Sequence, residues 1–569
     1  MQPSKVAEDI AGALKASKQG FIAVGVFSFF VNILMLTAPL YMLQVYDRVV
    51  ASRNLETLFV LTILMLFLFS VMGVLEWLRS RILVRIGNQM DGYLSQRVYS
   101  AMFEMGIKKP EQRSAQPLSD FTSIRQFLTG NGPFAFFDAP WLPIYIAVLF
   151  LFHAAFGWFA IGAALILFTV AVLNERMTKK QLGEANGENV RAQNLAASNI
   201  KNAEVLHAMG MLPGIMQRWY QQHQKFLAKQ TEASDKAGIF SNLSKVLRMI
   251  FQSAILGLGA YYVVINEMSP GMMIAGSILL GRALAPMDLL INSWAGFNNA
   301  RSAYGRLSEL LTAIPAQQRK MPLPSPQGQV DVESLVVIPP GSQLPALRGV
   351  QFRVQPGEHV GVVGPSAAGK STLARALLGV WPAANGAVRI DGAEVNHYNR
   401  DELGPHIGYL PQDIELFDGS ISDNIARFGE VDSVKVVEAA KKAGVHDMIL
   451  HLPNAYDTVI GSTSGALSGG QRQRIGLARA LYGQPKVIVL DEPNSNLDDV
   501  GEQALALTLE QLRQEGVTVF VVSHRPSLLR HVDKLLVLKE GQVSDYGSRD
   551  DVMRRLAQQN STSTTPANR

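Results

Sequence analysis

The sequence predicts a multi-domain chain in which an all-α membrane domain of six helices precedes an α/β nucleotide-binding domain. Six apolar runs, each long enough to cross a bilayer, lie in the first part of the chain. In the second part, a phosphate-binding loop lies between a short apolar run and a helical pattern. Because 569 residues are too many for one hydrophobic core, two or more domains are expected.

The composition supports a membrane part and excludes several kinds of chemistry. The chain is 48% hydrophobic and only 17% charged, with a mean hydropathy of +0.13. Its net charge of +5 is explained by basic loops beside the membrane rather than by nucleic acid, so no nucleic-acid partner is expected. The chain contains no cysteine, which excludes disulfides, cysteine-ligated zinc and a cysteine nucleophile.

The apolar runs place the membrane domain at residues 20–314, after a cytoplasmic N-terminal segment of residues 1–19. The first run follows Lys15 and Lys18, as in a secretory signal, but continues to Tyr46 without a cleavage pattern. A retained transmembrane helix is therefore the better interpretation. The alternative of six buried soluble helices is disfavoured because the runs contain almost no charge. The runs are 20–46, Leu58–Leu78, Phe134–Leu151, Phe156–Leu173, Ile250–Ile265 and Met272–Ile291.

Lysine and arginine are distributed unevenly among the loops. They are frequent between the second and third runs and between the fourth and fifth. They are absent from the turn between the third and fourth runs, 153–157, and from the turn between the fifth and sixth, 266–271. Because positive loops stay inside, both termini and the nucleotide-binding domain are predicted to be cytoplasmic. The two basic segments are expected to extend the membrane helices into the cytoplasm and to transmit motion; the alternative is that they are only solvated helices.

Two charged residues, Arg282 and Asp288, lie within or near the sixth run. Charged groups in a span are costly and usually face the protein interior or an aqueous path, which suggests a role in translocation. Equally, Asp288 could lie close enough to the interface to be solvated. Both interpretations stay open from the sequence.

The boundaries of the second domain follow from composition. Residues 315–329 form a linker that begins at Pro315 and is rich in proline. Short Val/Ile/Leu strands then alternate with helices, which predicts a mostly parallel α/β domain over residues 330–556. The polar tail, residues 557–569, has nothing to bury and is predicted to be disordered.

The phosphate-binding loop is a Walker A motif with the sequence Gly364-Pro365-Ser366-Ala367-Ala368-Gly369-Lys370-Ser371, followed by Thr372. Its glycines allow backbone N–H groups to point at phosphate oxygens, and the helix N-terminus behind them favours an anion. Lys370 is expected to neutralise the β- and γ-phosphates, and the Ser371 hydroxyl to bind Mg²⁺. The motif predicts a bound nucleotide but does not say how its energy is used.

A buried strand, Val487–Leu490, ends in the carboxylates Asp491 and Glu492. Ligands of doubly wound sheets bind at such strand ends, so this pair is the natural partner of the loop. Asp491 is expected to hold Mg²⁺ through its water shell. Glu492 is expected to polarise the water that attacks the γ-phosphate. An isolated pair of this kind is usually a solvated strand end, but the loop makes that alternative improbable.

The stretch Leu467-Ser468-Gly469-Gly470-Gln471 resembles the signature of the ATP-binding cassette (ABC) family, and the resemblance covers the whole second domain. It implies that two such domains meet head to tail, with each ATP between the phosphate-binding loop of one copy and these signature residues of the other. The alternative is a glycine turn that caps a helix through Ser468. Residue by residue, the resemblance implies that Gln412 contacts Mg²⁺ and water, that His524 holds the γ-phosphate, and that Asp498 lies in the loop linking the two ATP sites.

The chain departs from the ABC pattern in two places. No aromatic residue occurs between Tyr304 and Phe352, where the family usually places one to stack on adenine. Val337 or Ile338 is expected to pack there instead and to discriminate weakly between bases. The segment Gly461–Gly465 also lacks the acidic residue that many exporters carry before the signature.

Three stretches resemble the type I secretion ATPases that export proteases, lipases and surface-layer proteins: Ala38–Val49, Asp138–Trp141 and Gly364–Lys370. The resemblance runs from about residue 20 to 556. It implies the type I ABC exporter fold and a homodimer in the bacterial inner membrane, with both ATP sites hydrolytic. It further implies a periplasmic adaptor, an outer-membrane channel and an unfolded polypeptide substrate with a C-terminal signal. The alternative is an exporter of lipid or drug-like amphiphiles, which has the same architecture.

Overall fold

The computed structural model describes residues 10–316, 322–461 and 467–563. The chain divides into two compact units, one of residues 1–106 and 112–316, the other of residues 107–111 and 317–569. The division after Ala316 falls inside the predicted linker. Each unit has its own hydrophobic core.

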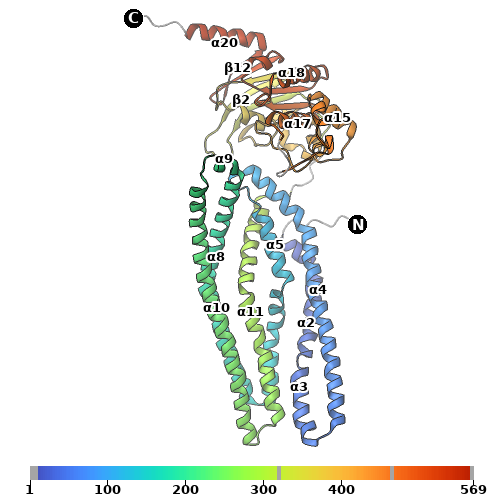
Figure 1. The fold of residues 1–569 in the computed structure, drawn as a ribbon, viewed down its shortest axis with the longest axis vertical. Coiled ribbons are helices and arrows are strands. Elements are labelled where there is room, and N and C mark those ends of the chain that lie inside the picture. Colours follow the sequence, from blue (N-terminus) through green and yellow to red (C-terminus); the bar gives the residue numbers. More distant parts are fainter. Residues whose placement is uncertain (1–9, 317–321, 462–466, 564–569) are drawn as a thin grey trace, which may run out of the picture. The chain divides into compact units, whose positions relative to one another are not determined.

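The first unit is entirely helical (Figure 1). Six of its helical segments are long and apolar enough to cross a membrane, in agreement with the six predicted runs. The predicted cytoplasmic extensions are helical as well, since α4, α8 and α10 have 54, 48 and 53 residues. The helices are α1 (Ile10–Ala16), α2 (Lys18–Leu34), α3 (Thr37–Gln44), α4 (Leu55–Lys108), α5 (Gln116–Thr129), α6 (Gly132–Asp138), α7 (Leu142–Phe152), α8 (Ala154–Lys201), α9 (Ala203–Ala208), α10 (Leu212–Val264) and α11 (Pro270–Ala313).

The first span is broken into three pieces, which the sequence did not predict. Helix α2 ends at Leu34, α3 begins at Thr37, and a π-helical segment, η1 (Val45–Val50), follows it. Pro39 lies in the first turn of α3, where its missing N–H costs least. The residues between Ala38 and Val49 that resemble secretion ATPases thus coincide with a locally irregular helix.

The π-helical segment is joined to the start of α11 by one carboxylate. Asp47 Oδ1 accepts a hydrogen bond from the backbone N of Gly271 at 2.8 Å, and Oδ2 accepts one from Ser269 Oγ at 2.6 Å. A Cβ at Gly271 would lie 2.5 Å from Asp47 Oδ1, so the close approach needs glycine. Asp47 therefore caps α11 from another span and uses the positive end of that helix.

A buried polar network connects the first three spans. Asp138 accepts hydrogen bonds from Arg79 Nη1 at 3.0 Å and from Asn32 Nδ2 at 2.8 Å. Asn32 also accepts from Tyr145 OH, at 2.9 Å on its backbone oxygen. The guanidinium of Arg79 lies 4.1 Å from the ring centre of Phe134. Buried charges are tolerated because each is paired, so this network fixes how α2, α4 and α6 pack.

The apolar helices pack through small residues where they approach most closely. Phe156 of α8 is fully buried against Gly276 of α11, where an added Cβ would lie 2.3 Å from the Phe156 ring. Leu167 of α8 and Leu280 of α11 belong to the same core. Helices α8 and α10 run side by side over much of their length (Figure 1).

The second unit contains the predicted α/β domain. Its main sheet has six strands in the order β12-β11-β3-β10-β9-β6, and only β12 is antiparallel to its neighbour. A four-stranded antiparallel sheet, β2-β1-β4-β5, lies beside it. The strands are β1 (Val330–Val337), β2 (Leu347–Val354), β3 (His359–Val363), β4 (Asn385–Ile390), β5 (Ala393–Glu394), β6 (Ile407–Leu410), β7 (Gly419–Ser420), β8 (Val459–Ile460), β9 (Val487–Asp491), β10 (Thr518–Val522), β11 (Lys534–Lys539) and β12 (Gln542–Ser548).

The helices of this unit are mostly short, and one extends further than predicted. Helix α20 continues to Ser563, so residues 557–563 are helical where the sequence predicted disorder, and residues 564–569 lie outside the described residues. The helices are α12 (Lys370–Leu377), α13 (Arg400–Leu403), α14 (Ile421–Ile425), α15 (Ser433–Lys442), α16 (His446–Leu450), α17 (Gly469–Leu481), α18 (Asp499–Gln514), α19 (Pro526–Leu529) and α20 (Arg549–Ser563).

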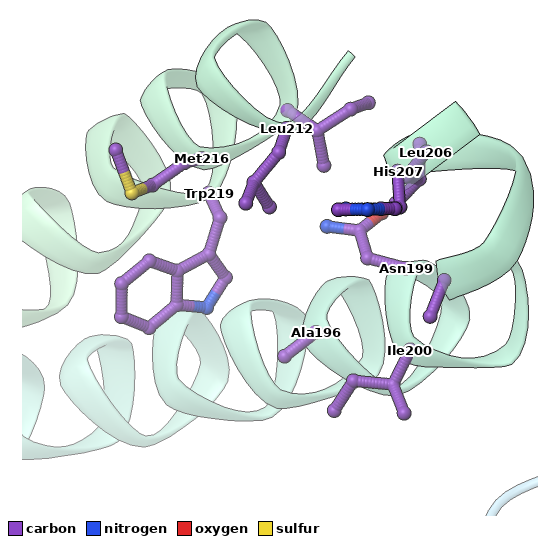
Figure 2. A pocket seen from close by; sticks show the side chains of 10 residues that line it. Ala196, Asn199, Ile200, Leu206, His207, Leu212, Met216 and Trp219 are labelled. Atoms are coloured by element: carbon purple, nitrogen blue, oxygen red, sulfur yellow. The ribbon is translucent and has the colours of Figure 1, made fainter. Parts of the chain in front are cut away.

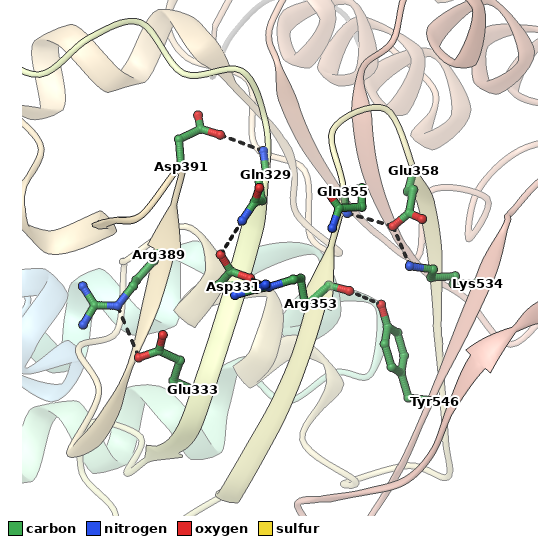
Figure 3. A network of polar contacts seen from close by, with 10 residues as sticks. All are labelled: Gln329, Asp331, Glu333, Arg353, Gln355, Glu358, Arg389, Asp391, Lys534 and Tyr546. Atoms are coloured by element: carbon green, nitrogen blue, oxygen red, sulfur yellow. Dashed lines mark hydrogen bonds and ion pairs between the residues drawn. The ribbon is translucent and has the colours of Figure 1, made fainter.

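Polar contacts join the two sheets beside the strand that leads to the phosphate-binding loop (Figure 3). Tyr546 of β12 donates to the backbone oxygen of Arg353 on β2, and the Arg353 side chain pairs with Asp331 of β1. Lys534 of β11 donates to Glu358 at 2.7 Å, immediately before β3. The contact from Tyr546 joins the two sheets, and the pair of Lys534 and Glu358 joins β11 to the residue just before β3.

Candidate functional site

The phosphate-binding loop connects the buried strand β3 to α12. Pro365, Ser366 and Ala367 are exposed, whereas Ala368 is buried and anchors the turn. Gly369 has a positive φ of 99°, and an added Cβ there would lie 2.9 Å from the oxygen of Ala346. The loop therefore needs glycine at this position, and its exposed turn at the start of a helix suits an anion.

Lys370 is folded over the loop. Its Nζ donates to the backbone oxygens of Gly364 at 2.8 Å and Pro365 at 3.0 Å. Burial lowers the pKa of Lys370, and the nearby carboxylates of Glu492 and Asp491 act in the opposite direction. The ammonium group is thus positioned to neutralise an anion in the loop.

Asp491 is the last residue of β9 and is buried. Burial raises its pKa, as does the charge of Glu492, while a hydrogen bond from Ser371 lowers it. Its Oδ1 atom has no hydrogen-bond partner among the residues that the structure describes. A buried, unpartnered carboxylate oxygen beside a hydroxyl is the kind of oxygen ligand set that suits Mg²⁺. The oxygen atoms of Asp491 and Ser371 therefore fit the predicted Mg²⁺.

Three predicted catalytic side chains meet at the carboxyl ends of adjacent strands. Gln412 follows β6, Glu492 follows β9 and His524 follows β10. Gln412 Nε2 donates to Glu492 Oε2 at 3.0 Å, and His524 Nε2 lies 3.8 Å from Glu492 Oε1. The backbone N of Glu492 donates to the oxygen of Val522 at 2.9 Å, although Glu492 has a positive φ of 50°. The site is where ligands bind in doubly wound sheets.

The signature residues form a separate corner of the domain. Ser468 Oγ accepts from the backbone N of Gln471 at 3.2 Å, and Gln471 Oε1 accepts from the backbone N of Ser468 at 2.8 Å. This capping box starts α17, as the helix-capping alternative expected. Gly470 approaches Asn496, since a Cβ would lie 2.7 Å from its oxygen. No hydrogen bond or ion pair joins residues 468–471 to the phosphate-binding loop in the described part of the chain.

Gln473, which no sequence motif indicated, links the signature helix to the residues that follow the catalytic strand. Gln473 is only 1% exposed, and its Nε2 donates to the backbone oxygens of Glu492, at 3.3 Å, and Pro493. Its Oε1 accepts from the backbone N of Asn496 at 2.9 Å. The available signal was its position four residues before Leu477, which puts a polar side chain on the apolar face of α17.

Two other predicted positions have local roles in this chain. Asp498 Oδ1 accepts from the backbone N of Gly501 at 2.8 Å and caps α18. Of the two residues expected to replace the adenine-stacking aromatic, Val337 is fully buried in the core and Ile338 is 41% exposed. Only Ile338 is therefore accessible to a base. Most of the segment Gly461–Gly465, where an acidic residue is missing, lies outside the described residues.

The two charged residues of the sixth span, Asp288 and Arg282, differ in their contacts and exposure. Asp288 accepts from Ser244 Oγ at 2.8 Å and pairs with Arg248 Nε at 2.9 Å. These contacts join α11 to α10, so Asp288 has a structural role. Arg282 is exposed, and no hydrogen bond or ion pair of its side chain is found among the described residues. Its predicted role in translocation stays a prediction.

A second candidate is an apolar pocket of about 410 Å³ between the ends of α8, α9 and α10 (Figure 2). Trp219 of α10 lies opposite Ala196 of α8, and Met216 and Ile200 also belong to the lining. The lining contains no carboxylate, lysine or arginine, so it cannot replace the phosphate-binding loop as a nucleotide site. Its chemistry suits an apolar side chain.

The six-span helical unit and the ATP-binding unit together define an ABC transporter. The family described as "ABC transporter transmembrane region" matches residues 21–286, and the family described as "ABC transporter" matches residues 347–495. A bacterial Atm1-family ABC exporter with ATP bound has the same fold, with a TM-score of 0.82 over 97% of this chain and 99% of that chain at 21% identity.

Similar proteins indicate the branch of the ABC transporter family to which the chain belongs. The type I secretion system ATP-binding protein PrsD of Rhizobium meliloti (strain 1021) is 47% identical over 96% of this chain and 94% of its own length. The cyclolysin secretion/processing ATP-binding protein CyaB of Bordetella pertussis is 28% identical over 92% of this chain and 75% of its own length. The chain belongs to the type I secretion system branch of the ABC transporter family.

Proposed function

We propose that the chain is the ABC component of a type I secretion system and uses ATP hydrolysis to export an unfolded polypeptide with a C-terminal signal across the inner membrane. The observation that carries the proposal is the similarity to PrsD along almost the whole chain, including both units. The relatives are named for the secretion or translocation of proteins, which favours a polypeptide over the lipid or drug-like alternative.

In this proposal the residues of one domain bind and orient the nucleotide. The loop from Gly364 to Thr372 holds the phosphates through its backbone N–H groups and through Lys370. Mg²⁺, when bound with ATP, offsets negative charge on the phosphates, and Ser371, Asp491 and Gln412 are the residues that would hold it.

Hydrolysis is assigned to the three side chains at the strand ends. Glu492 orients the attacking water and accepts its proton. Gln412 holds the carboxylate of Glu492 from one side, as its 3.0 Å hydrogen bond suggests. His524 lies on the other side of Glu492 and contacts the γ-phosphate. Each group follows a strand of the main sheet at the same edge, which suits a reaction that depends on positioning.

A homodimer would complete each site. The residues Ser468, Gly469, Gly470 and Gln471 lie at the start of α17, a helix of 13 residues, and bond to their own helix rather than to their own phosphate-binding loop. A second copy would present this positive helix end to the γ-phosphate. Both sites would then hydrolyse ATP, because each chain contributes Glu492 and a complete signature.

Each remaining segment of the chain is assigned either to the cytoplasm or to the inner membrane. Residues 1–19, the linker 315–329 and the ATP-binding domain 330–556 lie in the cytoplasm, and the domain 20–314 spans the inner membrane beside lipid. A periplasmic adaptor and an outer-membrane channel continue the path of the polypeptide.

The test is secretion by cells that carry Glu492→Gln in place of the native chain. Removing the carboxylate should abolish both ATP hydrolysis and export, measured as substrate in the medium. Undiminished secretion would refute active export by this chain. Stimulation of ATPase activity by lipid, with no response to a polypeptide C-terminus, would favour the amphiphile exporter instead.

A further inference from the structure

A cavity of about 270 Å³ lies between α8, α10 and α11, just beyond the cytoplasmic ends of the fourth, fifth and sixth spans. Every residue that lines it is neutral. Leu182 and Ile291 supply apolar wall, while Asn174, Trp294 and Asn298 supply polar groups. The cavity is smaller than the roughly 300–1,000 Å³ typical of sites for drug-sized ligands.

Three polar atoms in this lining have no hydrogen-bond partner among the described residues: Asn174 Oδ1, Trp294 Nε1 and Asn298 Nδ2. The side chains of Asn174 and Asn298 are buried, with exposed fractions of 3% and 8%. Leaving a buried polar group unpaired costs about 1–3 kcal/mol, and native structures rarely leave several together. Their concentration in one cavity therefore indicates that they pair with something outside the chain, either ordered water or a bound polar group.

Two more cavities lie next to the first, and each shares wall residues with its neighbour. One of about 270 Å³ shares Leu182 and Asn298 with it, and a third of about 440 Å³ shares Asn186 and Asn299 with the second. The combined lining extends from Asn174 to Gln193 of α8, which is roughly 28 Å at the rise of an α-helix. An extended chain of about eight residues spans that length. We call this row of three cavities the amide track, because asparagine and glutamine side chains recur along it.

The chemistry of the first cavity suits a peptide backbone, whereas further along the track Asn186 Nδ2 already donates to Asn299 Oδ1 at 3.2 Å. Each peptide group offers one N–H donor and one C=O acceptor, and a carboxamide side chain can pair with both. Arg306 in the track is already paired with Asp120, at 2.9 and 2.6 Å. Lys179 and Arg301 line the middle cavity, so the phosphate of a lipid is the rival ligand there. The first cavity, which holds all three unpartnered atoms, has no charge to attract a phosphate.

We propose that the amide track binds the main chain of the exported polypeptide in an extended form at the cytoplasmic mouth of the membrane domain. Recognition through the backbone is independent of side-chain sequence, so a site of this kind accepts each successive segment of an unfolded chain. The inference rests on the proposed export of a polypeptide. Its test needs no ATP hydrolysis and no secretion, so the two can fail separately.

The test uses the full-length protein in nanodiscs of phosphatidylethanolamine and phosphatidylglycerol, without nucleotide. Because the native chain has no cysteine, Ala295→Cys provides a single attachment point in the lining for a maleimide-linked benzophenone. The probe is a Gly/Ser/Ala peptide of about ten residues, slightly longer than the track. The matched control is the same peptide with alternate backbone nitrogens methylated, which removes N–H donors and leaves the side chains unchanged.

We expect photo-crosslinking to the unmethylated peptide to exceed that to the methylated peptide by about fivefold or more, since each lost hydrogen bond weakens binding by roughly two- to twelvefold. The double variant Asn174→Leu/Asn298→Leu should remove this difference, whereas Asn194→Leu, an exposed residue of the same helix outside the cavities, should preserve it. Thermal unfolding checks that the double variant is folded.

Equal crosslinking of the two peptides by the labelled Ala295→Cys protein, in which Asn174 and Asn298 are intact, would overturn the proposal, and this comparison does not depend on how the double variant folds. Crosslinking to phosphatidylglycerol with none to the unmethylated peptide would also overturn it and assign the cavities to lipid. Peptide binding by a protein that fails to secrete would leave the amide track in place and refute only the export function.

Discussion

Gln412 donates a hydrogen bond from Nε2 to Oε2 of Glu492 at 3.0 Å, although 80 positions separate the two residues in the sequence. The contact exists because β6 and β9 are parallel neighbours that end at the same edge of the sheet. It presets the orientation of the carboxylate that is assigned to hydrolysis.

Gln412→Leu should lower the ATPase rate by about tenfold or more, because a hydrogen bond to a charged group is worth roughly 1.5–3 kcal/mol. A titration with Mg²⁺ should also show weaker activation if Gln412 is a metal ligand. Gln503→Leu, an exposed glutamine of α18, is the control and should leave the rate unchanged. A native rate for Gln412→Leu would remove Gln412 from the catalytic group.

Gln473→Leu should destabilise the ATP-binding unit by about 1–3 kcal/mol, since it leaves the backbone oxygens of Glu492 and Pro493 and the N–H of Asn496 without their partner. The ATPase rate should fall with it, because Glu492 loses its support. Thermal unfolding and ATPase assays measure the two effects. If the rate fell with no change in stability, Gln473 would act on the reaction alone.

Arg79→Leu should destabilise the membrane unit by about 3–5 kcal/mol, because Asp138 would be left as a buried charge without its counterion. The double variant Arg79→Leu/Asp138→Leu should be less destabilised than the sum of the two single variants. Thermal unfolding in detergent gives the four values of this cycle. Additive effects would show that the two side chains do not stabilise each other.

Asp47→Leu should cost about 0.5–2 kcal/mol, the usual value of a helix cap, because α11 loses an acceptor at Gly271 and Ser269. Gly271→Ala should have a similar effect, since its Cβ would displace the carboxylate. Combining the two should add little to either alone. A double variant that loses the full sum would show that the residues act independently.

Ile338→Tyr should lower the KM for ATP several-fold, because an aromatic ring stacked on a base contributes roughly 1–3 kcal/mol. The native chain should hydrolyse GTP nearly as well as ATP, and the variant should prefer ATP. Val337→Tyr is a poor substitute, since Val337 is fully buried and pairs with Leu347. A strong native preference for ATP over GTP would contradict the expectation.

The sequence was sufficient for features that depend on local composition. Six long apolar runs with almost no charge identify six membrane spans, because a soluble helix does not require a run of that length. The ordered motifs identify the ATP-binding domain. The break between α2 and α3 was not predictable, since the apolar run continues through it and only Pro39 marks the change. The helix beyond residue 557 was missed because polar composition alone does not prevent a helix from continuing.

Contacts that depend on tertiary structure could not be derived from motifs. Gln473 donates to backbone oxygens just after β9, 19 and 20 positions away, so nothing in its own neighbourhood in the sequence indicates the partner. The three unpartnered atoms of the amide track come from α8 and α11, whose relative rotation is set by packing. For Asp288 the sequence left a path role and a solvated position near the interface open, and it could not indicate the contacts of Asp288 with Arg248 and Ser244 that join α11 to α10.

Helices α8 and α10 have 48 and 53 residues and no internal proline, which makes them rods of roughly 72 and 80 Å. The hydrocarbon core of a bilayer is about 30 Å thick, so more than half of each rod lies outside it. Neither rod is interrupted along its length, so a displacement at one end of it can reach the other end without being absorbed at a break. The first span, divided between α2 and α3, and the third, divided between α6 and α7, in contrast contain points at which the membrane unit can bend.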